Sequence, residues 1–294
     1  MPAITDPPPS ETQQELDALS AQLDRDVPRR TKDNLLVATW NIREFGGLTD
    51  KWRSGPNDSP KRDLSSLACI AETVSRFDVF AIQEAQADLR ALRHMLKLLG
   101  DDYTVILTDP VEDDEGGGER LAFVFNKKRL DVSGLACELV VPFNWTKKKK
   151  PKTGIDQVAL KRQFARTPYA VAFKRNSSTF ILVTLHIIWG KGKGALANRT
   201  EELSSIATWL RSWARDVNSW DQNLICLGDF NIDREGSGLW QAFISTGLTT
   251  PPEIAKPRII GGEPLAGFYD QISWFTETKP ARNRLVFPRP NGHG

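Results

Sequence analysis

Asp229 and Asn231 follow a short apolar run, residues 224–227, in the sequence LICLGDFNID. The run is too short and too apolar for a surface helix, so it predicts an interior strand. Gly228 interrupts it, and the period-two spacing of Asp229 and Asn231 puts both side chains on one side of an extended chain. A carboxylate and an amide placed together can hold a metal ion, a phosphate or a transition-state oxygen. Both residue types also favour turns, so a plain turn cap is the competing interpretation.

Four further predicted strands carry polar residues at or near an end. These residues are Asn41 and Arg43, Gln83 and Glu84, His186, and Asp270. The combined set is rich in acids and amides, contains one histidine, and includes no candidate Ser or Cys nucleophile. Such oxygen-rich sets suit a hard divalent cation, which neutralises a phosphate and helps to activate water.

The alternation of short apolar runs and helical patterns indicates the elements that must position these residues. Strands are predicted at residues 35–42, 79–84, 103–108, 120–126, 169–174, 179–187, 223–231 and 269–275, and helices at 11–26, 62–76, 88–100 and 197–217. So many strands with so few helices do not fit a simple alternating βαβ sheet. The pattern predicts an α/β (α+β) fold, a four-layer sandwich of two packed sheets flanked by helices.

Composition excludes several classes of protein. No apolar stretch approaches the roughly 20 residues that span a bilayer, and the N-terminal sequence lacks the basic and apolar regions of a secretory signal. The three cysteines are widely spaced in apolar contexts, which predicts free thiols in a reducing compartment. We therefore expect a cytoplasmic monomer with no membrane partner.

Residues 1–31 are predicted to be a flexible N-terminal arm with a short amphipathic helix, and residues 32–294 are predicted to form a single domain.

Positive charge is concentrated in one part of the chain. Residues 144–175 contain ten Lys or Arg and one acid, a local net charge of +9 against +2 for the whole chain, which leaves −7 for the remainder. Lys147, Lys148, Lys149 and Lys150 form an unbroken run. A lysine run is often a solvated loop, but beside an anionic substrate it would attract phosphate.

The ordered series TWNIREFG, AIQEA, ERLAFVF, TLHIIWG, LGDFNID and FYDQI resembles the endonuclease/exonuclease/phosphatase superfamily, and within it the bacterial deoxyribonuclease-I-like members. The resemblance runs from about residue 35 to residue 275. Each motif alone is weak, but all six occur in the expected order on the expected elements. The resemblance implies two packed mixed β-sheets flanked by helices, with the active site at one rim of the sandwich.

The resemblance also implies a role for each candidate residue. Glu84 would be the principal ligand of Mg²⁺, or of Mn²⁺ or Ca²⁺, with Asn41 beside it. His186 would bind the scissile phosphate or protonate the leaving oxygen, and Glu119 would orient His186. Asp229 and Asn231 would orient the attacking water and stabilise the pentacovalent phosphorus. The remaining matches are Arg166, a phosphate-contacting arginine, and Asp270, the acid that orients the family's second histidine.

Other interpretations of single residues stay open. Glu119 follows EGGG and could be a plain surface residue, and Arg166 could form a structural ion pair. Trp40 and Trp189, next to motif residues, are predicted to pack in the core rather than to stack on a base.

One motif of the family pattern is absent from the sequence. The pattern closes with Ser-Asp-His on a last strand, and no such tripeptide occurs here. His293 lies among glycine and asparagine and is not expected to replace the missing histidine. The sequence therefore predicts a member without the last strand, in which the loss of a general base reduces turnover.

We expect a Mg²⁺-dependent endonuclease that hydrolyses DNA. The alternatives are a phosphatase or phosphodiesterase acting on a small or lipid-linked phosphate, and a catalytically impaired protein that binds nucleic acid.

Overall fold

The computed structural model describes residues 2–111, 117–140, 163–190, 192–215, 223–251, 258–260, 263–265 and 267–275. The chain forms two compact units, one comprising Met1–Pro110 and Gly118–Leu130 and the other beginning at Asp131. Each unit contains one main β-sheet with its own helices and its own hydrophobic core. No described helix is long and apolar enough to cross a membrane.

The first unit is built on a four-stranded mixed sheet. Its elements are α1 (Ser10–Asp26), β1 (Val37–Phe45), α2 (Leu64–Val74), β2 (Val79–Ala85), α3 (Arg90–Leu99), β3 (Tyr103–Leu107) and β4 (Arg120–Asn126). The strand order is β1-β2-β4-β3, with β1 and β2 parallel and the other pairs antiparallel. Apolar residues of α2 and α3 pack against β2 and β4 to form the core of this unit. The polar ends of β1 and β2 therefore lie side by side at the same edge.

Local capping explains why α2 begins where it does. Asp63 takes the N-cap position, where its carboxylate accepts hydrogen bonds from the backbone N–H and the hydroxyl of Ser66, at 2.9 and 2.7 Å. A third bond, from the N–H of Ser54 at 2.9 Å, ties the preceding loop to the same carboxylate. An N-cap of this kind satisfies a backbone donor that the helix itself leaves open.

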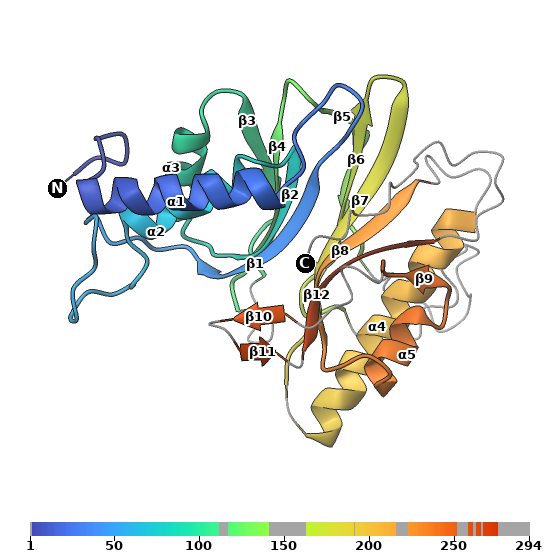
Figure 1. Cartoon of the computed structure of the whole chain (residues 1–294). Coiled ribbons are helices and arrows are strands. Elements are labelled where there is room, and N and C mark those ends of the chain that lie inside the picture. Colours follow the sequence, from blue (N-terminus) through green and yellow to red (C-terminus); the bar gives the residue numbers. More distant parts are fainter. Residues whose placement is uncertain are drawn as a thin grey trace. The chain divides into compact units, whose positions relative to one another are not determined.

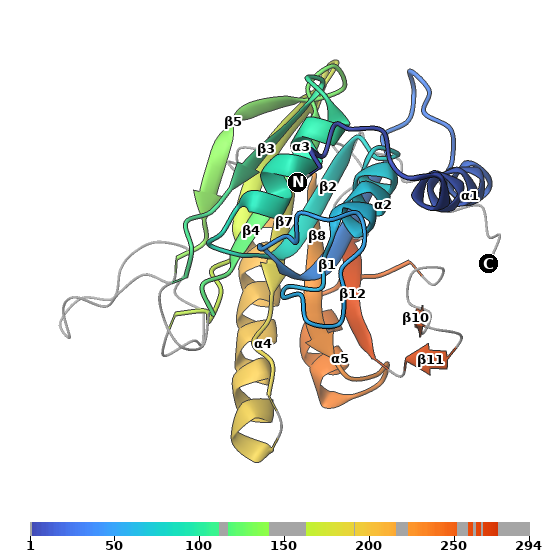
Figure 2. The same ribbon diagram turned by 90° about the vertical axis from the view of Figure 1, so that its left-hand side faces the viewer.

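The N-terminal helix packs on the first unit. Ile4 is buried in the core of that unit, and the hydroxyls of Thr12 in α1 and Ser65 in α2 lie 2.5 Å apart in a buried hydrogen bond. Figure 2 shows α1 beside α2. The predicted amphipathic helix is therefore present.

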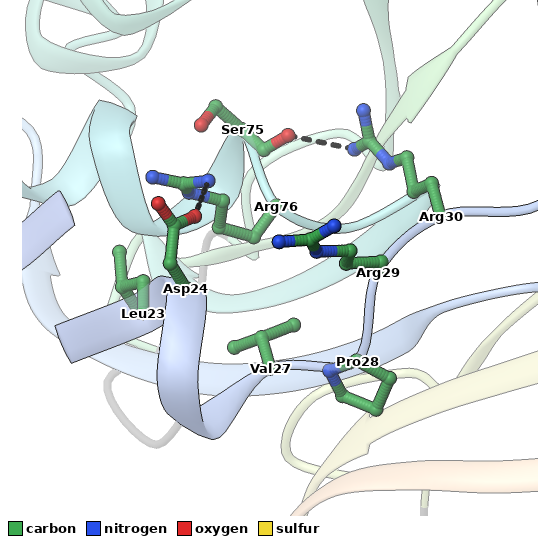
Figure 3. A pocket seen from close by; sticks show the side chains of 8 residues that line it. All are labelled: Leu23, Asp24, Val27, Pro28, Arg29, Arg30, Ser75 and Arg76. Atoms are coloured by element: carbon green, nitrogen blue, oxygen red, sulfur yellow. Dashed lines mark hydrogen bonds and ion pairs between the residues drawn. The ribbon is translucent and has the colours of Figure 1, made fainter. Parts of the chain in front are cut away.

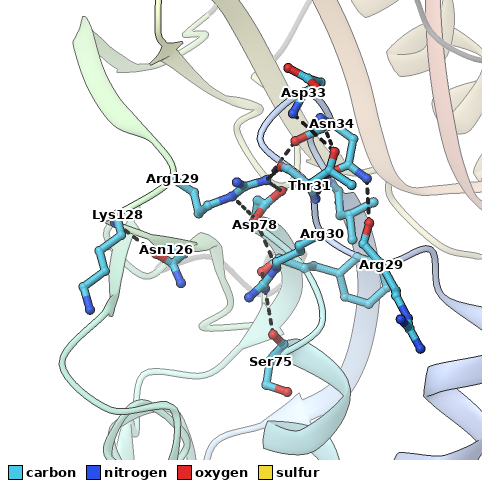
Figure 4. A network of polar contacts seen from close by, with 12 residues as sticks. Arg29, Arg30, Thr31, Asp33, Asn34, Ser75, Asp78, Asn126, Lys128 and Arg129 are labelled. Carbon is cyan, nitrogen blue, oxygen red and sulfur yellow. Dashed lines mark hydrogen bonds and ion pairs between the residues drawn. The ribbon is translucent and has the colours of Figure 1, made fainter.

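A buried carboxylate fixes the segment between α1 and β1. Asp78 is fully buried, and its carboxylate lies 3.1 Å from Nε of Arg30 and 2.9 Å from Nε of Arg129 (Figure 4). The backbone N–H of Leu36 donates to its second oxygen at 2.8 Å. Because a buried charge is costly unless it is paired, this network strongly favours one path for the chain that enters β1.

The second unit is built on a six-stranded mixed sheet. Its elements are β5 (Asp131–Glu138), β6 (Tyr169–Arg175), β7 (Ser178–His186), α4 (Lys193–Arg215), β8 (Leu224–Ile232), α5 (Gly238–Ile244), β9 (Leu248–Thr249), β10 (Arg258–Ile260), β11 (Glu263–Leu265) and β12 (Phe268–Phe275). The strand order is β5-β6-β7-β8-β12-β9, with β7 and β8 parallel, while β10 and β11 form a separate antiparallel pair. Side chains of α4 and α5 pack with β6, β7 and β8 in the second core. Figure 1 shows α4 and α5 side by side.

All eight predicted strands and four predicted helices are present. The sequence did not predict β5, α5 or the short strands β9, β10 and β11. The strand β5 lies at an edge of its sheet and alternates between exposed and half-buried residues, so it lacks a long apolar run. The helix α5 has seven residues and is too short to show a helical period.

Candidate active site

Asn41 and Glu84 meet where the parallel strands β1 and β2 end. The side-chain amide of Asn41 donates to Oε1 of Glu84 at 2.8 Å, and the backbone N–H of Glu44 donates to Oε2 at 2.9 Å. Both Glu84 oxygens are therefore held in place, and the side chain stays half-buried. The adjacent Gln83 is fully buried and hydrogen-bonds Thr39, so it belongs to the sheet rather than to the site.

The backbone at Glu84 adopts a conformation that side chains rarely take. Its φ is +60°, and Glu44, which binds it, has φ +50°. The pairing of β2 with both neighbouring strands shifts register at this point. Such irregularities redirect a side chain at the end of a strand, and a left-handed residue costs about 1–3 kcal/mol that the surroundings must offset. The irregular backbone at Glu84 thus orients its carboxylate toward Asn41 and the Glu44 N–H, while the regular pairing of β2 with β1 and β4 is interrupted.

Glu119 lies next to Glu84. Oxygen atoms of these two half-buried carboxylates lie within 4.8 Å of each other. Two like charges this close favour a cation between them, and carboxylate and amide oxygens are the donors that Mg²⁺, Mn²⁺ and Ca²⁺ prefer. The chemistry of Glu84, Glu119 and Asn41 therefore fits a hard divalent cation.

Arg62 supports this half of the site, although no sequence signal indicated it. Its guanidinium donates to the backbone carbonyl oxygens of Arg43 and Glu44, at 2.5 and 2.6 Å, and lies 5.3 Å from the ring centroid of Phe45. Burial lowers the pKa of Arg62, and the charges of Glu44 and Glu84 oppose that shift. The residue holds the turn that supplies the Glu44 N–H to Glu84.

In the second unit, three ionisable residues lie in line across adjacent strands. His186 in β7 pairs in register with Asp229 in β8, which pairs in register with Asp270 in β12. All three are buried, at 4%, 6% and 7% exposure. Side chains at paired positions lie on the same face of a sheet. The closest approach of His186 Nε2 to Asp229 Oδ2 is 3.8 Å, which is longer than a hydrogen bond.

Gly228 and Asn231 set the position of Asp229. A Cβ atom at Gly228 would lie 2.1 Å from the backbone oxygen of Leu185, so only glycine lets β8 lie this close to β7. Asp229 Oδ1 accepts the backbone N–H of Asn231 at 2.9 Å. Asn231 has φ +48°, and its amide donates to the carbonyl oxygen of Ile187 at 2.6 Å. Asp229 therefore makes a local turn-type hydrogen bond with Asn231 and also lies in the row of paired residues between His186 and Asp270.

The other predicted contacts fall in different places. Arg166 is half-buried and lies just before β6. The lysine run, Lys147 to Lys150, lies outside the described residues. Trp40 and Trp189 do not pack in the core as the sequence predicted, because their exposed fractions are 36% and 46%. Instead, the Trp189 ring contacts the ring of Tyr269 edge-on, with centroids 5.6 Å apart.

A hollow of about 260 Å³ lies elsewhere in the first unit. It is lined by residues of the end of α1 and of the turn after α2, which are Leu23, Asp24, Val27, Pro28, Arg29, Arg30, Ser75 and Arg76 (Figure 3). None of the predicted site residues lines it. The guanidinium groups of Arg30 and Arg76 are bound to Ser75 and Asp24 at its wall.

Comparison with known proteins identifies a family. The model of the endonuclease/exonuclease/phosphatase family matches residues 38–289. None of the curated protein sequences matches the chain. An endonuclease/exonuclease/phosphatase family protein of Bacteroides thetaiotaomicron superposes with a TM-score of 0.53 and 20% identity, covering 81% of this chain and 82% of that one. A mannosyl-6-phosphatase of the same species gives 0.51 and 19%, with 82% and 85% covered. These similarities confirm the predicted α/β sandwich fold.

Proposed function

The chain belongs to the endonuclease/exonuclease/phosphatase family, and we propose that within it this protein is a Mg²⁺-dependent endonuclease that hydrolyses DNA by in-line attack of water. The family makes the chain a hydrolase of phosphodiesters or phosphate monoesters. What we propose beyond the family is that the metal ion is Mg²⁺, that the substrate is DNA and that the protein cleaves within the DNA strand.

The observation that carries the proposal is the pair of carboxylates at the end of the four-stranded sheet. Glu84 and Glu119 have oxygen atoms within 4.8 Å of each other, and Asn41 is bonded to Glu84. Glu84 and Asn41 would hold Mg²⁺, with Glu119 as a further acid nearby. When bound, the ion neutralises charge on the phosphate and favours ionised water. The hydrogen bonds from Asn41 and Glu44 keep the carboxylate of Glu84 oriented without substrate.

The residues of the six-stranded sheet would perform the proton transfer and positioning. His186 would donate a proton to the leaving oxygen, and Asp229, whose carboxylate is fixed by the Asn231 N–H, would hold the attacking water together with the Asn231 side chain. Asp270 would add negative charge to the same row.

Charge distribution supports a polyanionic substrate. Residues 144–175 carry a net charge of +9 and include Arg166 and the lysine run from Lys147 to Lys150. Lysines that neutralise successive phosphates give affinity that is independent of sequence and falls with salt. The second candidate is a phosphatase of small phosphate esters, which the fold similarity to a mannosyl-6-phosphatase favours.

The test compares nicking of supercoiled plasmid with hydrolysis of mannose 6-phosphate, each with Mg²⁺ and with EDTA. We expect nicking that requires Mg²⁺ and that falls at least about 10²-fold in Glu84→Gln, because charge stabilisation at the phosphate is lost. Glu11→Gln is the matched control, since it makes the same chemical change on the exposed side of α1. Calorimetry of Mn²⁺ binding to both variants reports loss of the metal site, and urea unfolding of the same variants reports loss of the fold.

Each alternative has its own outcome. Hydrolysis of the sugar phosphate without nicking would replace the endonuclease with the phosphatase. Salt-dependent DNA binding without hydrolysis of either substrate would favour the impaired nucleic-acid-binding protein. Nicking that is unchanged in Glu84→Gln would refute the assignment of the metal ligand.

A further inference from the structure

Helix α4 carries two ionisable side chains that the proposed reaction does not use. Arg199 is 4% exposed and Glu202 is 1% exposed, one helical turn apart. Burying a charged group is costly unless charge-assisted hydrogen bonds compensate. Each of these residues must therefore make contacts that the fold needs.

Glu202 binds two backbone segments that are far apart in the sequence. Its Oε1 accepts the N–H of Ala165 at 2.9 Å, and its Oε2 accepts the N–H of Ile188 at 3.0 Å. Ala165 directly precedes Arg166, and Ile188 lies two residues after His186. One buried carboxylate thus joins the segment that presents the predicted phosphate-binding arginine to the segment that follows the predicted proton donor.

Arg199 holds the end of β8. Its Nη2 donates to the carbonyl oxygen of Asn231 and, at 2.7 Å, to Oδ1 of Asp233. Its guanidinium also lies 5.0 Å from the ring centroid of Trp189. The amide of Asn231 returns to Ile187 in the segment that Glu202 binds. The two side chains of α4 therefore connect three segments. One segment precedes β6, the second follows β7 and the third lies at the end of β8.

We propose that Glu202 and Arg199 are positioning residues for the phosphate site, with α4 as the rigid element that aligns Arg166, His186 and Asn231. This inference rests on the proposed function. A helix holds such groups more accurately than loops do. Because a displacement of about 1 Å at reacting groups can cost about 10²-fold in rate, the two residues act on turnover without contacting the phosphate.

Glu202→Gln tests the role of the carboxylate. Glutamine has the same shape, but only its carbonyl oxygen can accept, so one of the two backbone N–H bonds is lost together with the charge. Glu201→Gln is the matched control, because it makes the same change one residue earlier on the same helix. Amide hydrogen exchange reports the effect whether or not the substrate is correctly assigned.

We expect the amide of Ala165 or Ile188 to exchange about 10- to 100-fold faster in Glu202→Gln, which corresponds to one lost charge-assisted hydrogen bond. The amides of β6 should be unchanged. In plasmid nicking, kcat should fall by about the same factor while KM stays within about twofold, because the affinity for the phosphate backbone is retained. Glu201→Gln should match the wild type in both measurements.

Several results would overturn the inference. Unchanged exchange at both amides, or an equal fall in kcat for Glu201→Gln, would remove Glu202 from any positioning role. If Glu202→Gln does not fold, Arg199→Lys and Arg199→Met replace it. A positioning role then requires that lysine retain more of kcat than methionine at equal KM, and equal values would refute it. An inactive wild type with faster exchange in Glu202→Gln would refute the proposed function, while the anchoring of the segments would stand.

Discussion

Gly228→Ala should destabilise the protein strongly, because the added methyl group meets backbone rather than a movable side chain. The new Cβ would lie 2.1 Å from the carbonyl oxygen of Leu185 and 3.0 Å from its nitrogen, inside the parallel pair of β7 and β8. Overpacking of this kind costs about 1–3 kcal/mol. The φ of +136° adds about 1–3 kcal/mol of backbone strain, and alanine recovers about 0.4–1 kcal/mol by restricting the unfolded chain. The net loss is about 1–6 kcal/mol.

Urea unfolding followed by tryptophan fluorescence measures this loss, provided that the slope of the transition stays constant between variants. Gly236→Ala is the matched control, because Gly236 has φ +74° but nothing within 4 Å of its Cβ position. It should lose about 1–2 kcal/mol from the left-handed backbone alone. If Gly228→Ala is no less stable than Gly236→Ala, the close approach of β8 to Leu185 is not as described, and the explanation for the glycine next to Asp229 fails.

Three further predictions concern stability and thiol chemistry. Asp63→Ala removes the N-cap of α2 and should cost about 1 kcal/mol. Burial opposes ionisation of Asp63, but its hydrogen bonds to Ser66 and Ser54 lower its pKa. The stabilisation from Asp63 is therefore present above the unfolded pKa of about 4, and it is lost as the pH falls through the lower folded pKa. Urea titrations at pH 7 and pH 3 should therefore show a smaller difference between variant and wild type at the lower pH, and an equal difference would contradict the assignment. Asp78→Ala leaves Arg30 and Arg129 without their buried partner and should cost about 3 kcal/mol in the free energy of unfolding. This value is at the low end for a broken buried ion pair, because both arginines keep some contact with solvent. A loss below about 1 kcal/mol in the same assay would show that the network contributes little. Burial raises the pKa of the Cys226 thiol well above its usual value. This cysteine should therefore react with a thiol reagent at pH 8 only after the protein unfolds. Labelling of Cys226 in the native protein, mapped by mass spectrometry, would count against its burial.

The strands could be predicted because their signal is local. Runs such as those that became β2 and β8 are apolar over nearly their whole length, since both faces of these strands are buried. The same local signal located Asn41, Glu84, His186 and Asp229, because a polar residue at the end of an apolar strand is conspicuous. Strand β5 and helix α5 escaped prediction because an edge strand and a seven-residue helix lack that contrast.

The supporting residues could not be predicted. In the sequence, Arg62 is an arginine before a helix, and Arg199 and Glu202 are ordinary charged residues of an amphipathic helix. They form hydrogen bonds to backbone groups more than ten residues away, such as the Ala165 N–H or the Arg43 carbonyl oxygen. The exposure of Trp189 also depends on such distant neighbours, which explains why its predicted burial was wrong.

Motifs and periodicity are properties of neighbouring residues, so they were sufficient to predict the family, the eight more apolar strands in chain order and the set of chemically capable residues. How these residues are held depends on contacts between distant parts of the chain, which the local sequence does not encode. Sheet register aligned His186, Asp229 and Asp270 across three strands, and irregular pairing turned Glu84 toward Asn41. Both effects depend on hydrogen bonds between strands that are far apart in the chain, and their register is set by packing across the whole sheet.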